Sequence, residues 1–262
     1  MFSLFHIIFL AVTLPVTVGL AIFVGKKWGW NKWVLYVCVG ICIVSELTKI
    51  TYLVLTEGGS YVVNDAGNNE WSYYLLQRHL PFNLCSIQII FIFIITFATA
   101  SKLTKPLLAF MYPTMLGGGI MALLIPTSSV NHGWFTPISF QFWIFHAMLI
   151  FLALYIIITK YKELNMKSYF TALVMLAGTL IFAIYINAIL GGAETGVNFF
   201  FVARPPMENI PILNFNNGWV VYILNLTWLA ILLTSLCYIP IFVRAIRQRI
   251  RAKQISPTTT QE

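Results

Sequence analysis

Residues 138–159, ISFQFWIFHAMLIFLALYIIIT, contain no Asp, Glu, Lys or Arg and decide the fold class. At 1.5 Å per residue, a helix of about this length crosses the roughly 30 Å hydrocarbon core of a bilayer. The stretch lacks the period-two alternation of a membrane barrel strand. Similar stretches recur along the chain, which is 59% hydrophobic and 9% charged. The sequence therefore predicts an all-α, polytopic membrane protein.

Seven apolar stretches are long enough to be transmembrane helices. We predict spans at about 2–25, 33–57, 81–100, 106–125, 138–159, 169–190 and 219–243. The polar stretches after the second, fourth and sixth spans are expected to be loops. Pro113 and the triplet Gly117–Gly119 predict a kink or a close helix contact in the fourth span. The prediction is one seven-helix domain over residues 1–250 and a disordered tail over 251–262.

The distribution of basic residues gives this bundle a direction. Of the 16 lysines and arginines, all except Lys49, Arg78 and Arg204 fall on one predicted side of the membrane. Because basic residues concentrate on the cytoplasmic side, we predict that the N-terminus is outside and the C-terminus inside. The net charge of +8 is then explained by the membrane orientation and by contact with anionic lipid headgroups. It does not indicate nucleic-acid binding.

Several classes of site are not indicated. The four cysteines lie in apolar stretches without a CxxC spacing, so neither a disulfide framework nor a thiolate metal site is expected. A nucleotide-binding loop, an HExxH motif and a carboxylate-rich metal site are also missing from the sequence. We expect no cofactor and no metal. The expected partners are membrane lipids, and the sequence specifies no protein partner.

Polar side chains inside the spans are costly and therefore mark candidate sites. Glu46 and Lys49 share one helix face at i and i+3 spacing, either as a structural ion pair or as part of a binding pocket. Cys85 lies near a helix N-terminus, where the macrodipole favours a thiolate. His146 lies about 12 Å from the outer end of its span. Each of these two residues has a structural alternative, Cys85 as a small core residue and His146 as a hydrogen-bonded one.

Cys85 and His146 are predicted at comparable depth, and a cysteine with a histidine is the minimum for nucleophilic catalysis by a thiol. The other polar residues of the spans and loops are predicted in the same outer half of the membrane. We therefore expect an outward-opening pocket whose substrate-binding residues are Glu46, Lys49, Arg78, Asn83, Gln141, Asn187, Asn198 and Arg204.

Several segments resemble a known family: LPFNLCS at 80–86, MLGGGIMALLIP at 115–126, FHAMLIFLALY at 145–155 and the stretch 198–205. Together they resemble the YwaF-like family of bacterial integral membrane proteins and, more distantly, eukaryotic transmembrane protein 164, a lipid acyltransferase. The resemblance implies acyl transfer or hydrolysis on a lipid, with a cysteine and a histidine in the bundle of a bacterial plasma membrane protein. Asn83 stands where the bacterial pattern has histidine, and Phe82 aligns with the eukaryotic nucleophile.

Three functions remain open. The first is a lipid acyltransferase or acyl hydrolase in which Cys85 forms a thioester, His146 is the general base, and Asn83 or Gln141 stabilises the oxyanion. The second is a binding or transport protein whose outward pocket takes a small polar or zwitterionic solute. The third is a bundle that recruits partners and catalyses nothing.

Overall fold

The computed structural model describes residues 3–63, 69–98, 101–191, 195–205 and 212–255. In chain order the helices are α1 (Leu4–Trp28), α2 (Lys32–Glu57), α3 (Leu84–Phe97), α4 (Ser101–Leu124), α5 (Thr127–His132), α6 (Pro137–Lys160), α7 (Met166–Leu190) and α8 (Gly218–Ile255). Short 3₁₀ turns lie at η1 (Gln77–His79) and η2 (Phe199–Phe201). Strands β1 (Gly59–Val63) and β2 (Asn69–Tyr73) form an antiparallel hairpin that pairs Gly59 with Tyr73.

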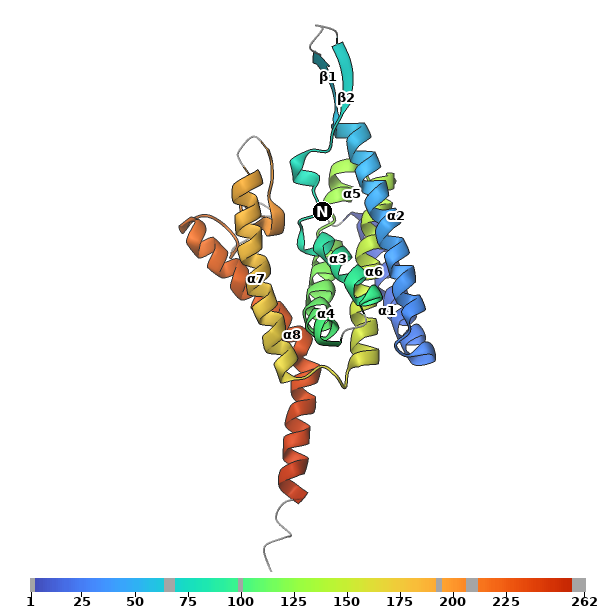
Figure 1. Ribbon diagram of the computed structural model, residues 1–262, viewed down its shortest axis with the longest axis vertical. Coiled ribbons are helices and arrows are strands. Elements are labelled where there is room, and N and C mark those ends of the chain that lie inside the picture. The colour runs from blue at the N-terminus through green and yellow to red at the C-terminus, as the bar shows by residue number, and fades with distance from the viewer. Residues whose placement is uncertain (1–2, 64–68, 99–100, 192–194, 206–211, 256–262) are drawn as a thin grey trace, which may run out of the picture.

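The prediction of an all-α membrane bundle is confirmed. Within the described residues, six helices are long and apolar enough to cross a membrane, and α3 is a shorter apolar helix of 14 residues. The predicted spans coincide with α1, α2, α3, α4, α6, α7 and α8. The hairpin lies at one end of the bundle, and α8 ends at the opposite end (Figure 1).

Helices α4 and α6 form the centre of the bundle. Helix α6 packs against α1, α2 and α4, and α4 also packs against α3, α7 and α8. The stretch of α4 from Leu107 to Met111 is buried throughout. Helices α7 and α8 lean away from α1 and α2, so they join the bundle through α4 (Figure 1).

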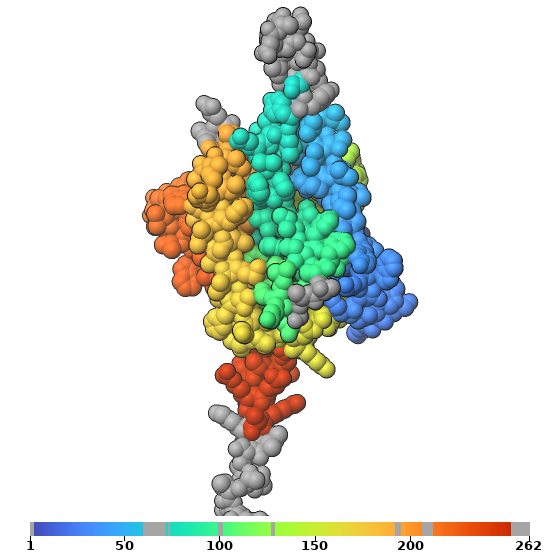
Figure 2. Space-filling model, in the orientation of Figure 1, coloured from blue at the N-terminus to red at the C-terminus, as the bar shows by residue number. Residues whose placement is uncertain are grey.

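Tyrosine hydroxyls hold α8 against α4. The Tyr112 hydroxyl donates to the Cys237 carbonyl at 2.6 Å, and the Tyr238 hydroxyl donates to the Ala109 carbonyl at 2.9 Å. This exchange between two helices satisfies buried polar groups where water is absent. Beyond this contact, the C-terminal part of α8 projects past the other helices (Figure 2).

Three boundary predictions are corrected by the structure. The third span begins at Leu84 instead of Pro81, because Leu80 and Asn83 are extended and Asn83 is the N-cap. The predicted loop after the fourth span contains the short helix α5. Helix α8 continues to Ile255, through the predicted start of the tail at 251, and residues 256–262 lie outside the described residues.

Candidate functional site

Cys85 and His146 lie on two sides of the glycine triplet of α4. A Cβ atom placed on Gly118 would be 3.7 Å from Cys85 Sγ, and one placed on Gly119 would be 3.2 Å from the His146 carbonyl oxygen. Consecutive helix residues differ by about 1.5 Å in height and 100° in direction. The Cys85 thiol and the His146 backbone therefore lie beside neighbouring residues of α4, about 9 Å below its end at Leu124.

The hydrogen bond of His146 fixes its tautomer. Nδ1 lies 2.8 Å from the Phe142 carbonyl oxygen, which can only accept, so Nδ1 carries the proton. In neutral imidazole the other nitrogen, Nε2, is then the acceptor. The ring is buried between Phe142 and Phe145, at centroid distances of 4.3 and 5.4 Å. His146 thus has the tautomer that a general base acting through Nε2 requires.

The start of α3 places Cys85 in the first turn of a helix inside the bundle. Among the described residues, the backbone N–H groups of Leu84, Cys85 and Ser86 have no acceptor, and the Asn83 side chain does not cap them. Asn83 Oδ1 instead accepts from the Phe200 N–H at 3.4 Å. The free donors and the helix dipole both favour negative charge at this point.

Phe82, at the position of the eukaryotic nucleophile, lies before α3. Its ring contacts the rings of Phe182 on α7 and Phe199 in η2, at centroid distances of 5.9 and 5.5 Å. Because the helix begins only at Leu84, Phe82 does not share a helix face with Cys85. Cys85 is therefore the thiol that the described residues offer beside the glycine triplet.

The loop after α7 is folded over the start of α3 by two asparagines. Asn187 donates to the Phe199 carbonyl at 3.0 Å and accepts from the Phe199 N–H at 2.9 Å. Asn198 Oδ1 accepts from the N–H groups of Ala203 and Arg204, and its amide donates to the Arg204 carbonyl. Asn187 on α7 and Asn198 in the loop thus use their amides to position the loop backbone.

Arg78 and Arg204 both lie close to Gly196. A Cβ atom on Gly196, whose φ is +65°, would be 3.5 Å from Arg78 Cδ and 3.7 Å from Arg204 Nη2. Arg204 Nη2 donates to the Gly196 carbonyl at 2.9 Å, and both arginines are exposed. Two guanidinium groups thus flank one turn of the loop above α3.

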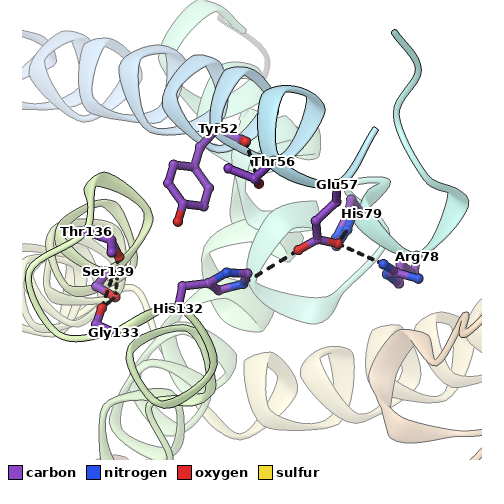
Figure 3. Close-up of polar contacts among 9 residues, drawn as sticks. All are labelled: Tyr52, Thr56, Glu57, Arg78, His79, His132, Gly133, Thr136 and Ser139. Atoms are coloured by element: carbon purple, nitrogen blue, oxygen red, sulfur yellow. Dashed lines mark hydrogen bonds and ion pairs between the residues drawn. The ribbon is translucent and has the colours of Figure 1, made fainter. Parts of the chain in front are cut away.

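A second polar cluster surrounds Glu57 at the end of α2 (Figure 3). Arg78 Nη2 and His79 Nε2 each lie 2.8 Å from Glu57 Oε2, and His132 Nε2 lies 3.9 Å from Oε1 on the opposite side. Burial lowers the pKa of His79 below its ordinary range, although the Glu57 carboxylate opposes this shift. The cluster ties η1 and α5 to α2.

The remaining predicted site residues, Glu46, Lys49 and Gln141, have partners on α2. Glu46 forms an ion pair with Lys49 at 2.6 Å within α2, which fits the structural reading of this pair. Gln141 donates to Ser45 Oγ at 2.6 Å and faces α2. A groove of about 490 Å³ between α2 and α6 includes Gln141 in its lining. Neither this groove nor a second cavity at the other end of the bundle is lined by Cys85 or His146.

Gln88 is a buried polar residue near Cys85 that the predicted set of site residues did not include. It is fully buried one turn after Cys85, and its Nε2 donates to Thr114 Oγ1 at 3.0 Å. Thr114 donates its own proton to the Phe110 carbonyl, so the Gln88 amide orientation is fixed. Gln88 Oε1 is buried without a hydrogen-bond partner. Its i+3 spacing from Cys85 was the available signal.

Comparison with known proteins identifies the family. A model of the TMEM164 family matches residues 1–238, nearly the whole chain. This protein belongs to the TMEM164 family. No curated protein and no solved structure matches the chain. The resemblance to transmembrane protein 164 is confirmed, and this TMEM164-family chain is a multi-pass membrane protein. Its YwaF-like relationship and its location in a bacterial plasma membrane stay predictions.

Proposed function

We propose that this protein transfers or hydrolyses lipid acyl chains, with Cys85 as the nucleophile and His146 as the general base. The observation that carries the proposal is that the Cys85 thiol lies against Gly118 and the His146 backbone against Gly119, the next residue of α4. The family resemblance adds to it, since it implies acyl chemistry by a cysteine and a histidine within the bundle.

In the first step, Cys85 Sγ attacks the ester carbonyl of a lipid while its proton passes to His146 Nε2. The carbon–oxygen bond then breaks, and the proton passes from His146 to the departing alkoxide, which leaves as an alcohol. In the second step, an alcohol or water attacks the thioester, and its proton returns to the Cys85 sulfur. Transfer and hydrolysis differ only in the acceptor of the acyl group.

The free N–H groups at the start of α3 are the proposed oxyanion donors. Backbone donors that are fixed before the reaction stabilise the tetrahedral intermediate without reorganisation. Gln141 does not serve this role in the proposal, because its amide is hydrogen-bonded to Ser45. Asn83 contributes indirectly: its side chain holds the loop at Phe200 and leaves the helix N–H groups free.

Arg78 and Arg204 are the proposed binding groups for the lipid phosphate. Guanidinium groups suit phosphate oxygens through charge-assisted hydrogen bonds. Both lie close to Gly196 in the loop that covers the start of α3, so the proposal places the lipid headgroup there and its ester at Cys85. The substrate class in this proposal is a phospholipid.

The test is to incubate the purified protein in detergent with a phospholipid and to follow the thiol by mass spectrometry. We expect an acyl adduct on Cys85 that hydroxylamine removes, and loss of both adduct and turnover in Cys85→Ala. His146→Ala should slow acylation by about 10²–10⁴-fold. Cys237→Ala, which changes a cysteine on α8, is the matched control and should retain turnover.

The alternative of solute transport predicts the reverse pattern. If Glu46→Gln abolished uptake of a zwitterionic solute while Cys85→Ala had no effect, the binding or transport function would replace the one proposed. If phospholipid turnover were unchanged in both Cys85→Ala and His146→Ala, and no adduct formed, the catalytic proposal would be overturned.

A further inference from the structure

A cavity of about 180 Å³ lies at the end of the bundle opposite the hairpin, and its lining is basic. Three lysines contribute to it: Lys32 from the start of α2, Lys105 from the start of α4 and Lys160 from the end of α6. Glu163 is the single acidic residue of the lining. The charges of these side chains leave the cavity with an excess of two positive charges.

The acidic residue is already paired. Glu163 Oε1 lies 2.6 Å from Lys160 Nζ, which also sits 5.1 Å above the ring of Trp30. Among the described residues, Lys32 and Lys105 have no carboxylate partner. The uncompensated charge of the cavity therefore belongs to these two exposed lysines.

The positions of these two lysines within their helices add a second argument. Lys32 is the first residue of α2 and Lys105 lies in the second turn of α4, near helix ends where the macrodipole favours anions and disfavours cations. Neither α2 nor α4 has an acidic residue in its first turn. Two helix N-terminal regions and two lysines thus converge on one cavity whose acidic residue, Glu163, is paired with Lys160.

Apart from Thr104, the rest of the lining is largely apolar, with Leu35, Ile95 and Leu108 at the cavity walls. The volume is several times that of a water molecule, so it admits a phosphate group. A ligand with an anionic head and an apolar continuation fits both parts of this lining. Basic pockets between helices at one membrane face are a known mode of recognition for anionic lipid headgroups.

We infer that this cavity binds the phosphate group of an anionic lipid from the leaflet at this end of the bundle. The site is separate from Cys85 and independent of the proposed catalysis. Such a lipid stabilises the fold by linkage, because it bridges α2, α4 and α6 in the folded protein alone.

The experiment compares thermal stability in nanodiscs of phosphatidylcholine with and without a minor share of phosphatidate. We expect phosphatidate to raise the Tm of the wild-type protein. The double variant Lys32→Gln/Lys105→Gln should lose most of this rise, since each lysine contributes about fivefold in affinity. The double variant Lys162→Gln/Lys167→Gln, which changes exposed lysines at the same end and outside the cavity, should retain it.

Glu163→Gln tests the same site in the opposite direction. Removing the acidic residue should strengthen phosphatidate binding several-fold, which keeps the inference falsifiable if the lysine variants do not fold. An equal loss in both lysine pairs, or no gain in Glu163→Gln, would overturn the inference in favour of diffuse surface charge. If inorganic phosphate alone raised the Tm equally, the ligand of the cavity would be free phosphate and the inference of a lipid would be overturned.

Discussion

Each glycine of the α4 triplet meets a different neighbour, and Gly119 has the least room. A Cβ atom there would lie 2.7 Å from Ile150 Cγ1 and 3.2 Å from the His146 carbonyl oxygen, so α4 and α6 would have to separate. On Gly117 the nearest atom is Leu233 Cβ at 3.9 Å, which is an ordinary contact. Close packing of α4 against α6 therefore depends on the missing side chain of Gly119, whereas Gly117 has room for a methyl group.

We expect Gly119→Ala to lower the free energy of unfolding by about 1–3 kcal/mol through overpacking. It should also reduce any activity that depends on His146, because the strain falls on the backbone of that residue. Gly117→Ala is the control and should be neutral or stabilising by up to about 1 kcal/mol, since alanine favours helix. Thermal unfolding of both variants in detergent checks this, and equal stability of the two would contradict it.

At the residue scale, the sequence predicted the depth of Cys85 and His146 and the close contact at the glycines. It could not predict which amides were free, because hydrogen bonds between helices depend on facing side chains. Gln141 was expected to stabilise the oxyanion, but its amide donates a hydrogen bond to Ser45 on α2. Gln88 was not selected, yet its Oε1 is the buried acceptor without a partner one turn from Cys85.

The loop that contains η2 is an element whose strain requires support. Phe200 and Phe201 have φ values of 56° and 57°, a conformation that costs about 1–3 kcal/mol for each non-glycine residue. Asn187 holds both backbone polar groups of Phe199, and Trp219 Nε1 donates to the Val202 carbonyl at 2.9 Å. Contacts with α7 and α8 therefore compensate the strained turn.

Asn187→Ala should release this loop from α7. The Phe199 N–H would be left buried and unpaired, at a cost of about 1–3 kcal/mol, and the Phe199 carbonyl would keep only its bond from the Val202 N–H. We expect faster hydrogen exchange and faster proteolysis across residues 195–205, with the helices unchanged. Thr171→Ala, which removes only a hydrogen bond within α7, is the control. Unaltered exchange of the loop in Asn187→Ala would show that the amide does not position it.

The positions of the long helices followed from apolar length, whereas the interruptions between them did not. Residues 74–83 lack an α-helical turn because an extended segment and η1 bring the chain to Asn83 before α3 starts. Pro81 had indicated a helix start there, but a proline at N1 is a preference and not a requirement. The hairpin and α5 form in stretches whose composition indicated loops.

At the scale of the whole molecule, the structure separates two ends with different chemistry. The hairpin end carries the Glu57 cluster and the loop above Cys85, and the opposite end carries the basic cavity and the arginine-rich part of α8 (Figures 1 and 3). The positive-inside rule predicts that the second end faces the cytoplasm. The proposed acyl chemistry then takes place toward the outer leaflet.

This orientation is tested by single cysteines at the two ends. Ser72→Cys lies in β2 at the hairpin end, and Glu163→Cys lies between α6 and α7 at the other. In intact cells, a membrane-impermeant maleimide should label Ser72→Cys alone, and permeabilisation should be needed to label Glu163→Cys. The wild-type protein is the control, since its four cysteines lie within helices. Labelling of Glu163→Cys before permeabilisation, with Ser72→Cys protected, would invert the topology and move Cys85 toward the inner leaflet.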